Sequence, residues 1–67
     1  MVIYDNVVEL AAKKNMTIMR VEREAGLANG TIGKWKTRAS DPRLKSIVAV
    51  ADVLGVTVNR LLRESTQ

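Results

Sequence analysis

Cysteine and histidine are both missing from this chain, and their absence narrows the chemistry that it can perform. Without cysteine there is no disulfide and no thiolate nucleophile, and without histidine there is no imidazole base. Zinc fingers and haem ligation usually depend on the same two residue types. We therefore expect no catalytic site, no metal site and no cofactor, and we do not expect an enzyme.

Long apolar runs are missing as well, so the sequence predicts no segment that spans a lipid bilayer. Residues 1–5 lack the basic start and the long apolar stretch of a signal peptide. We therefore expect the protein to stay in the cytoplasm, where a chain without cysteine fits a reducing environment.

The residues that are present have the balance of a small globular domain. The chain has 67 residues, of which 46% are hydrophobic and 27% are charged. These proportions are typical of a folded domain rather than of a disordered tail. No repeat or linker divides the sequence, so we predict one domain over residues 1–67 with a single core and with residues 64–67 frayed.

The spacing of apolar residues predicts an all-α fold of five short helices. The first helix places four apolar residues on one face: Ile3, Val7, Leu10 and Ala11. Asn15 follows this helix as a residue that tolerates a left-handed turn. A second helix is predicted over residues 18–25, with Thr17 as its N-cap and Gly26 at positive φ just past its end.

A third helix is predicted over about residues 29–36. Ile32 and Trp35 lie three residues apart in it, so both are expected to face the core, and Trp35 is not expected to stack on a ligand. Met16 and Met19 are interpreted as residues that fill gaps in the core.

The fourth helix is predicted to begin with Asp41 as its N-cap and Pro42 as its first residue, and to end at Gly55. Its core face is predicted to carry Leu44, Ile47, Val48, Ala51 and Leu54. Thr57 is a suitable cap for a last short helix.

The positive charge is concentrated in one segment. Between residues 28 and 47 the only acidic residue is Asp41, and elsewhere the two signs balance, so this segment holds the whole formal net charge of +4. Its basic residues are Lys34, Lys36, Arg38, Arg43 and Lys45. Such a local excess fits a polyanionic partner, and a solvated basic face explains the charge alone equally well.

The second and third helices have the residue types of a helix-turn-helix over about residues 17–36. Gly26 tolerates the positive φ of the turn, and Leu27 supplies a buried anchor. The outward residues of the next helix must be small or polar to enter a major groove about 12 Å wide. The residues that meet this demand are Asn29, Gly30, Thr31, Gly33 and Lys34.

Several short pieces of the chain match one known family. They are Thr17, Ala25-Gly26-Leu27, Thr31-Ile32-x-Lys34-Trp35, Pro42-x-Leu44 and Ala51-x-x-Leu54-Gly55-Val56-Thr57-x-x-x-Leu61-Leu62. Together they resemble the lambda-repressor-like, Cro/C1-type (XRE) helix-turn-helix family over residues 16–62. In detail the chain is similar to phage and prophage repressors of Gram-positive bacteria. The resemblance implies a compact five-helix DNA-binding domain and a transcriptional repressor that binds a palindromic operator as a dimer.

Several positions depart from the family's common pattern, among them Ile18 in place of glutamine and Lys36 in place of glutamate, and two of the others bear on how the helices pack and are capped. Glu22 stands where a small alanine usually packs between the two helices, and Ala28 stands where a serine usually caps the recognition helix. Because a buried unpaired carboxylate is costly, we expect Glu22 either to pair with Arg20 or Arg23 or to lie in a wider helix crossing. Because Ala28 has no side-chain oxygen, we expect Asn29 to cap the recognition helix in its place.

The resemblance and the side-chain chemistry place four residues against bases. Asn29 is suited to a bidentate contact with adenine, and Lys34 to the O6 and N7 atoms of guanine. Gly30 allows a close approach of the backbone, and Thr31 reaches a phosphate or a thymine methyl group. A helix cap is an equally good interpretation of Asn29, and a solvated charge is the alternative for Lys34.

A second set is predicted to contact phosphates, which positions a domain without reading sequence. These residues are Thr17, Arg20, Lys36, Arg38, Arg43 and Lys45. The last helix carries apolar residues that are interpreted as core or as a dimer interface: Val58, Leu61 and Leu62.

The expected partners are double-stranded DNA and a second copy of the chain, with no membrane and no small-molecule ligand. In a bacterial host the protein would associate with the nucleoid. An antitoxin-like protein-interaction module with secondary DNA binding is the alternative function. A membrane-surface helix is less consistent with the sequence, because a loop and Pro42 interrupt the basic segment.

Overall fold

The computed structural model describes residues 2–37 and 42–63, which form helices and no strand. The helices are α1 (Val2–Lys13), α2 (Ile18–Ala25), α3 (Thr31–Thr37), α4 (Leu44–Leu54) and α5 (Val58–Leu62). The predicted all-α fold of five helices is confirmed. None of these helices is both long and apolar enough to cross a lipid bilayer.

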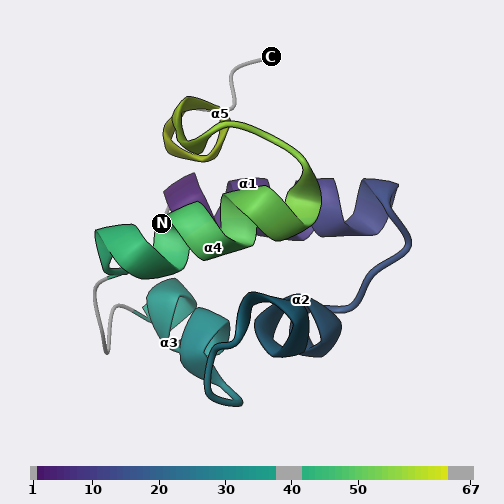
Figure 1. Ribbon diagram of the computed structural model, residues 1–67, viewed down its shortest axis with the longest axis vertical. Coiled ribbons are helices and arrows are strands. Elements are labelled where there is room, and N and C mark those ends of the chain that lie inside the picture. The colour runs from purple at the N-terminus through teal and green to yellow at the C-terminus, as the bar shows by residue number, and fades with distance from the viewer. Residues whose placement is uncertain (1, 38–41, 64–67) are drawn as a thin grey trace.

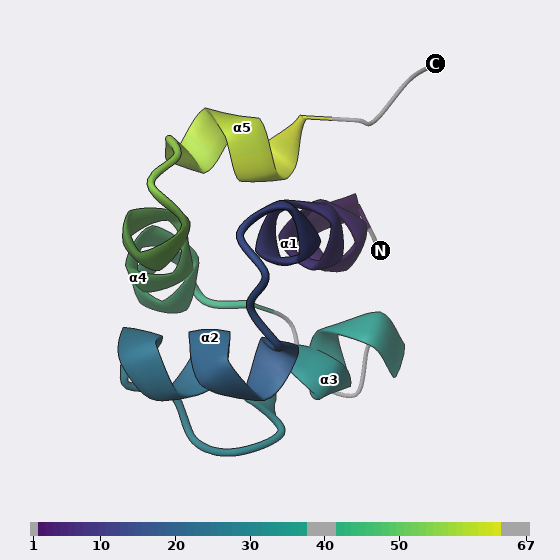
Figure 2. The ribbon, with the colours of Figure 1, turned by 90° about the vertical axis from the view of Figure 1, so that its right-hand side faces the viewer.

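The helices are arranged in three layers (Figure 1). Helices α1 and α4 form the middle layer, with α5 on one side and α2 and α3 on the other, as the turned view in Figure 2 also shows. Helix α2 packs against α4, α3 packs against α1, and α5 packs against both middle helices. The turn between α2 and α3 therefore lies at the end of the molecule opposite α5.

Threonine hydroxyls cap two of the helices as predicted. Thr17 accepts a hydrogen bond from the N–H of Arg20 at 3.1 Å at the start of α2. Thr57 accepts one from the N–H of Arg60 at 3.2 Å at the start of α5. In each case the side-chain oxygen satisfies a backbone donor that has no partner inside the helix.

The predicted left-handed residues are also confirmed. Gly26 follows α2 with φ of 76° and Asn15 follows α1 with φ of 57°, while Gly55, predicted only as the end of α4, also has a positive φ of 70°. An L side chain at such a glycine would be strained, so Gly26 is what allows the chain to turn directly out of α2.

Two helices begin later than predicted. Helix α3 starts at Thr31 and not at residue 29, because Gly30 has φ of 90° and lies outside helical conformation. Helix α4 starts at Leu44 and not at Pro42, because Arg43 is extended and serves as an N-cap without a side-chain hydrogen bond. The predicted cap Asp41 lies outside the described residues, as do residues 64–67.

The core face of α4 differs from the predicted one. Ile47, Ala51 and Leu54 are buried as predicted, and Val50 joins them at 0% exposure. Leu44 and Val48 are 69% and 49% exposed, so their predicted place in the core is wrong. The cause is the packing of α4 between α2 and α5, which turns inward the face that contains Val50.

The predicted core role of α3 is confirmed, since Ile32 is 0% and Trp35 is 1% exposed. Met16 is partly buried against the core. Met19, however, is 65% exposed, so its interpretation as a core gap-filler is wrong. It lines a surface pocket beside the turn, together with Leu27 and Asn29.

Asn6 is a buried polar residue that was not predicted from the sequence. It is 0% exposed, and its Nδ2 donates to the carbonyl oxygens of Leu61 and Arg63, each at 2.6 Å. Its Oδ1 has no hydrogen-bond partner among the described residues. Asn6 lies three residues after Ile3 and four before Leu10, so it shares their helix face, and this spacing could have predicted its burial. These hydrogen bonds connect the end of α5 to α1.

Candidate nucleic-acid interface

Helices α2 and α3 and the turn between them form a helix-turn-helix. The N–H groups of Gly26 and Leu27 donate to the carbonyl oxygens of Arg23 and Glu22 at 3.2 and 2.8 Å, which closes the end of α2. Leu27 is partly buried and packs against the core, as an anchor should. The turn covers residues 26–30, because α3 begins later than predicted.

The carboxylate of Glu22 holds the start of α3. Its Oε1 accepts from the N–H of Gly30 at 3.0 Å, and its Oε2 accepts from the N–H of Ile32 at 2.7 Å. Glu22 is only 3% exposed. These N–H groups are among the donors at a helix start that have no partner within the helix, so the burial of this charge is compensated.

The expected pairing of Glu22 with an arginine is therefore wrong. Arg20 instead pairs with Glu24, with its Nε 2.8 Å from the Glu24 Oε2, on the exposed side of α2. Backbone N–H groups at the start of α3 satisfy the Glu22 carboxylate instead.

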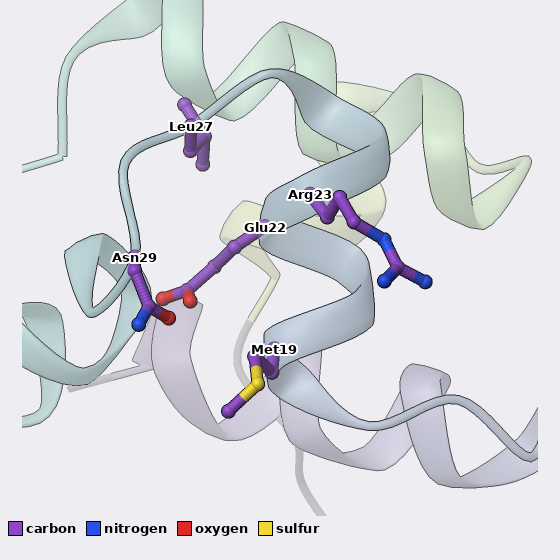
Figure 3. A pocket seen from close by; sticks show the side chains of 5 residues that line it. All are labelled: Met19, Glu22, Arg23, Leu27 and Asn29. Atoms are coloured by element: carbon purple, nitrogen blue, oxygen red, sulfur yellow. The ribbon is translucent and has the colours of Figure 1, made fainter.

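Asn29 is not the N-cap of α3. It precedes Gly30 in the turn and its side chain is exposed. Asn29 and Glu22 line one pocket of about 250 Å³ together with Met19, Arg23 and Leu27. Figure 3 shows the Asn29 and Glu22 side chains extending toward each other from the turn and from α2. The two N–H donors at the start of α3 bond to Glu22 and not to Asn29, whose side chain is exposed.

The first turn of α3 offers a small and polar outer face. Gly33 and Lys34 are exposed, and they follow a partly buried Thr31. The Thr31 hydroxyl donates to the carbonyl oxygen of Ala28 at 2.7 Å. This bond uses the only proton of the hydroxyl, so Thr31 can accept a hydrogen bond but cannot donate one to a phosphate without breaking it.

The described residues that were predicted to contact phosphates are all exposed: Thr17, Arg20, Lys36, Arg43 and Lys45. Arg38 lies outside the described residues. The Thr17 hydroxyl accepts from the backbone, so its own proton remains available to a phosphate oxygen.

Two of these cations lie next to other elements. The Nζ of Lys36 is 6.0 Å from the centre of the Tyr4 ring, which places the end of α3 beside α1. Arg43 lines a second pocket, of about 330 Å³, together with Thr31 and Trp35. The start of α4 therefore contributes its arginine next to the start of α3.

On α5 the three apolar residues have different environments. Leu61 is 0% exposed and belongs to the core, and Val58 is partly buried against it. Leu62 is 47% exposed.

Five helices, with a helix-turn-helix whose second helix presents polar and basic residues outward, define a class of small DNA-binding domains. The family model for the Cro/C1-type HTH DNA-binding domain matches residues 6–64. The chain therefore belongs to this family and is a DNA-binding domain of the kind found in transcription regulators, which confirms the resemblance that the sequence predicted. Comparison with curated proteins and with solved structures returned no match.

Proposed function

We propose that this protein is a sequence-specific repressor whose helix α3 enters the major groove of double-stranded DNA. The observation that carries the proposal is the division of α3 into two faces. Ile32 and Trp35 fix one face in the core, and the other face carries no bulky side chain before Lys34. A helix of this form fits a groove about 12 Å wide.

Four residues read the bases in this proposal. Lys34 donates to guanine, and the exposed amide of Asn29 makes a bidentate contact with adenine. Gly30 lets the backbone come close. Because the Thr31 hydroxyl is already bonded to Ala28, Thr31 contributes its methyl group to a thymine methyl and makes no phosphate contact.

The phosphate contacts come from elements that border α3. The start of α2 contributes Thr17 and Arg20, and the start of α4 contributes Arg43 and Lys45. Lys36 and Arg38 follow the base-reading residues along the chain. Contacts of this kind orient a domain and supply its sequence-independent affinity.

We further propose that the protein binds a palindromic operator as a homodimer. Val58 and the exposed Leu62 lie on α5, across the middle layer from α3 (Figure 2). A second copy on this side would leave α3 free to reach DNA. Two copies related by a twofold axis place two recognition helices about one DNA turn apart.

A second candidate is a protein-interaction module of the antitoxin type. Leu44 and Val48 favour it, because they lie four residues apart on α4 and are 69% and 49% exposed. Such a module would bind DNA weakly unless a partner protein were present.

Selection of bound duplexes from a random DNA pool, at near-physiological salt, tests the proposal. We expect enrichment of an inverted repeat with half-sites about 10 base pairs apart. Weak binding to all duplexes without enrichment would contradict sequence-specific repression and favour the interaction module.

A further inference from the structure

We infer that Glu22 is a positioning residue for base recognition: its carboxylate caps α3 from outside the helix and so leaves the amide of Asn29 available to a base. The inference rests on the proposed function, and it concerns a residue that does not touch DNA.

The start of α3 cannot be capped in the ordinary way. An ordinary N-cap residue has an extended backbone and a side-chain oxygen that accepts from the first turn. Gly30, the residue before α3, has no side chain, and its φ of 90° is one that L side chains rarely adopt. The acceptor must therefore come from another part of the chain, and Glu22 supplies it from α2.

The geometry of Glu22 suits this role. Each of its two oxygens accepts one backbone N–H, from Gly30 at 3.0 Å and from Ile32 at 2.7 Å. Charge-assisted hydrogen bonds of this kind are stronger than neutral ones. They fix the first turn of α3 relative to α2, and this turn carries Thr31 and Lys34, two of the four residues proposed to read DNA.

Asn29 is the competitor for the same donors. Asparagine side chains readily accept hydrogen bonds from N–H groups two or three residues ahead, and Ile32 lies three residues after Asn29. Both Asn29 and Glu22 line the same pocket (Figure 3). If Glu22 loses an acceptor oxygen, the Asn29 amide turns inward to cap the helix, and its contact with adenine is lost.

The first test compares Glu22→Gln with Glu24→Gln as a matched control. Both changes remove one negative charge from α2, but Glu24 is exposed and bonds only Arg20 among the described residues. The glutamine amide at position 22 has a single acceptor oxygen, so one of the two N–H groups loses its partner.

The readout is the ratio of affinities for the preferred duplex and for a scrambled duplex. We expect Glu22→Gln to lower this ratio about tenfold, the size of one lost base contact. Glu24→Gln should leave the ratio unchanged, because it alters only the general attraction to phosphates. An unchanged ratio in Glu22→Gln would overturn the inference and leave Glu22 as a stabilising cap alone.

The second test is a double-mutant cycle with Asn29→Ala. We expect Asn29→Ala to lower the ratio about tenfold in the wild-type background and to have little further effect in Glu22→Gln, where the amide has already been withdrawn. Equal effects of Asn29→Ala in both backgrounds would overturn the inference.

A measurement on the wild-type protein covers the case in which the variants do not fold. We expect the side-chain amide signals of Asn29 in an NMR spectrum to shift when the preferred duplex is added and to stay in place with the scrambled duplex. Signals that do not respond to the preferred duplex would overturn the inference. A wild-type protein that prefers no duplex would instead contradict the proposed function.

Discussion

Among single residues, the proposed DNA-binding surface depends on which polar groups already have hydrogen-bond partners within the protein. Glu22 takes two N–H groups at the start of α3, and the Thr31 hydroxyl is committed to Ala28. Asn29 and Lys34 remain exposed at this end of the helix-turn-helix. Much of the specificity is therefore expected to depend on these two side chains.

Replacement of Lys34 by alanine should weaken binding to the preferred duplex by about 1–3 kcal/mol and relax one base position, because a bidentate contact with guanine is lost. Titration of the variant against duplexes substituted at each position measures both effects. Lys45→Ala is the control, since a phosphate contact should weaken binding to every duplex alike. An equal loss on all sequences would make Lys34 a phosphate contact as well.

Replacement of Gly33 by alanine should change stability and binding in opposite directions. A Cβ at this position meets nothing within 4 Å, so alanine should raise the free energy of unfolding by about 0.5–1 kcal/mol through helix propensity. On the proposed DNA-facing side the added methyl group holds α3 away from the bases and lowers affinity. Urea unfolding and DNA titration measure the two effects. A stabilised variant with unchanged affinity would contradict a close approach at Gly33.

At the scale of helices, two caps of equal geometry have different expected functions. Thr17 and Thr57 have nearly the same backbone angles, and each accepts one N–H from the residue three positions ahead. The first begins the helix-turn-helix and the second begins α5. Substitutions at these two threonines can therefore distinguish what a helix cap contributes to stability from what it contributes to DNA binding.

Thr17→Ala and Thr57→Ala should each lower the free energy of unfolding by about 1 kcal/mol, because each removes one helix cap. Only Thr17→Ala should also weaken DNA binding, since its hydroxyl proton is available to a phosphate. Thr17→Ser keeps the hydroxyl and should retain both properties. Equal DNA affinity of Thr17→Ala and Thr57→Ala, measured at the same fraction folded, would show that Thr17 does not contact DNA.

At the scale of the whole molecule, the layered arrangement separates the two proposed surfaces. Helix α3 lies below the middle layer and α5 lies above it (Figure 1). The segment that carries the net charge of +4 includes α3 and the start of α4. Helix α3, which we propose enters the DNA groove, therefore lies within the basic segment of the sequence.

The logarithm of the binding constant should fall linearly with the logarithm of the salt concentration, with a slope of about −0.9 for each phosphate neutralised. Lys45→Ala should make the slope shallower by about one for each protomer bound. Arg63→Ala is the control, because it removes the same charge next to α5. If both variants change the slope equally, net charge and not a localised phosphate contact controls the affinity.

The positions of the helices and of the turn were largely determined by the sequence alone. Thr17, Thr57, Gly26 and Gly55 act through backbone groups within a few residues, so their effects are local and can be recognised in the order of residues. The spacing of Ile32 and Trp35 indicated the buried side of α3 for the same reason. The matching motifs likewise identified the family correctly.

Three features follow only from how the helices pack together: the partner of Glu22, the burial of Asn6 and the inward face of α4. Each depends on groups that are distant in the sequence and adjacent in the fold. Glu22 meets two backbone N–H groups at the start of α3, and Asn6 meets carbonyl oxygens at the end of α5. Leu44 is exposed because none of the described helices covers its side of α4. Residue order specifies neighbours within a helix, whereas contacts between helices form only when the layers pack together.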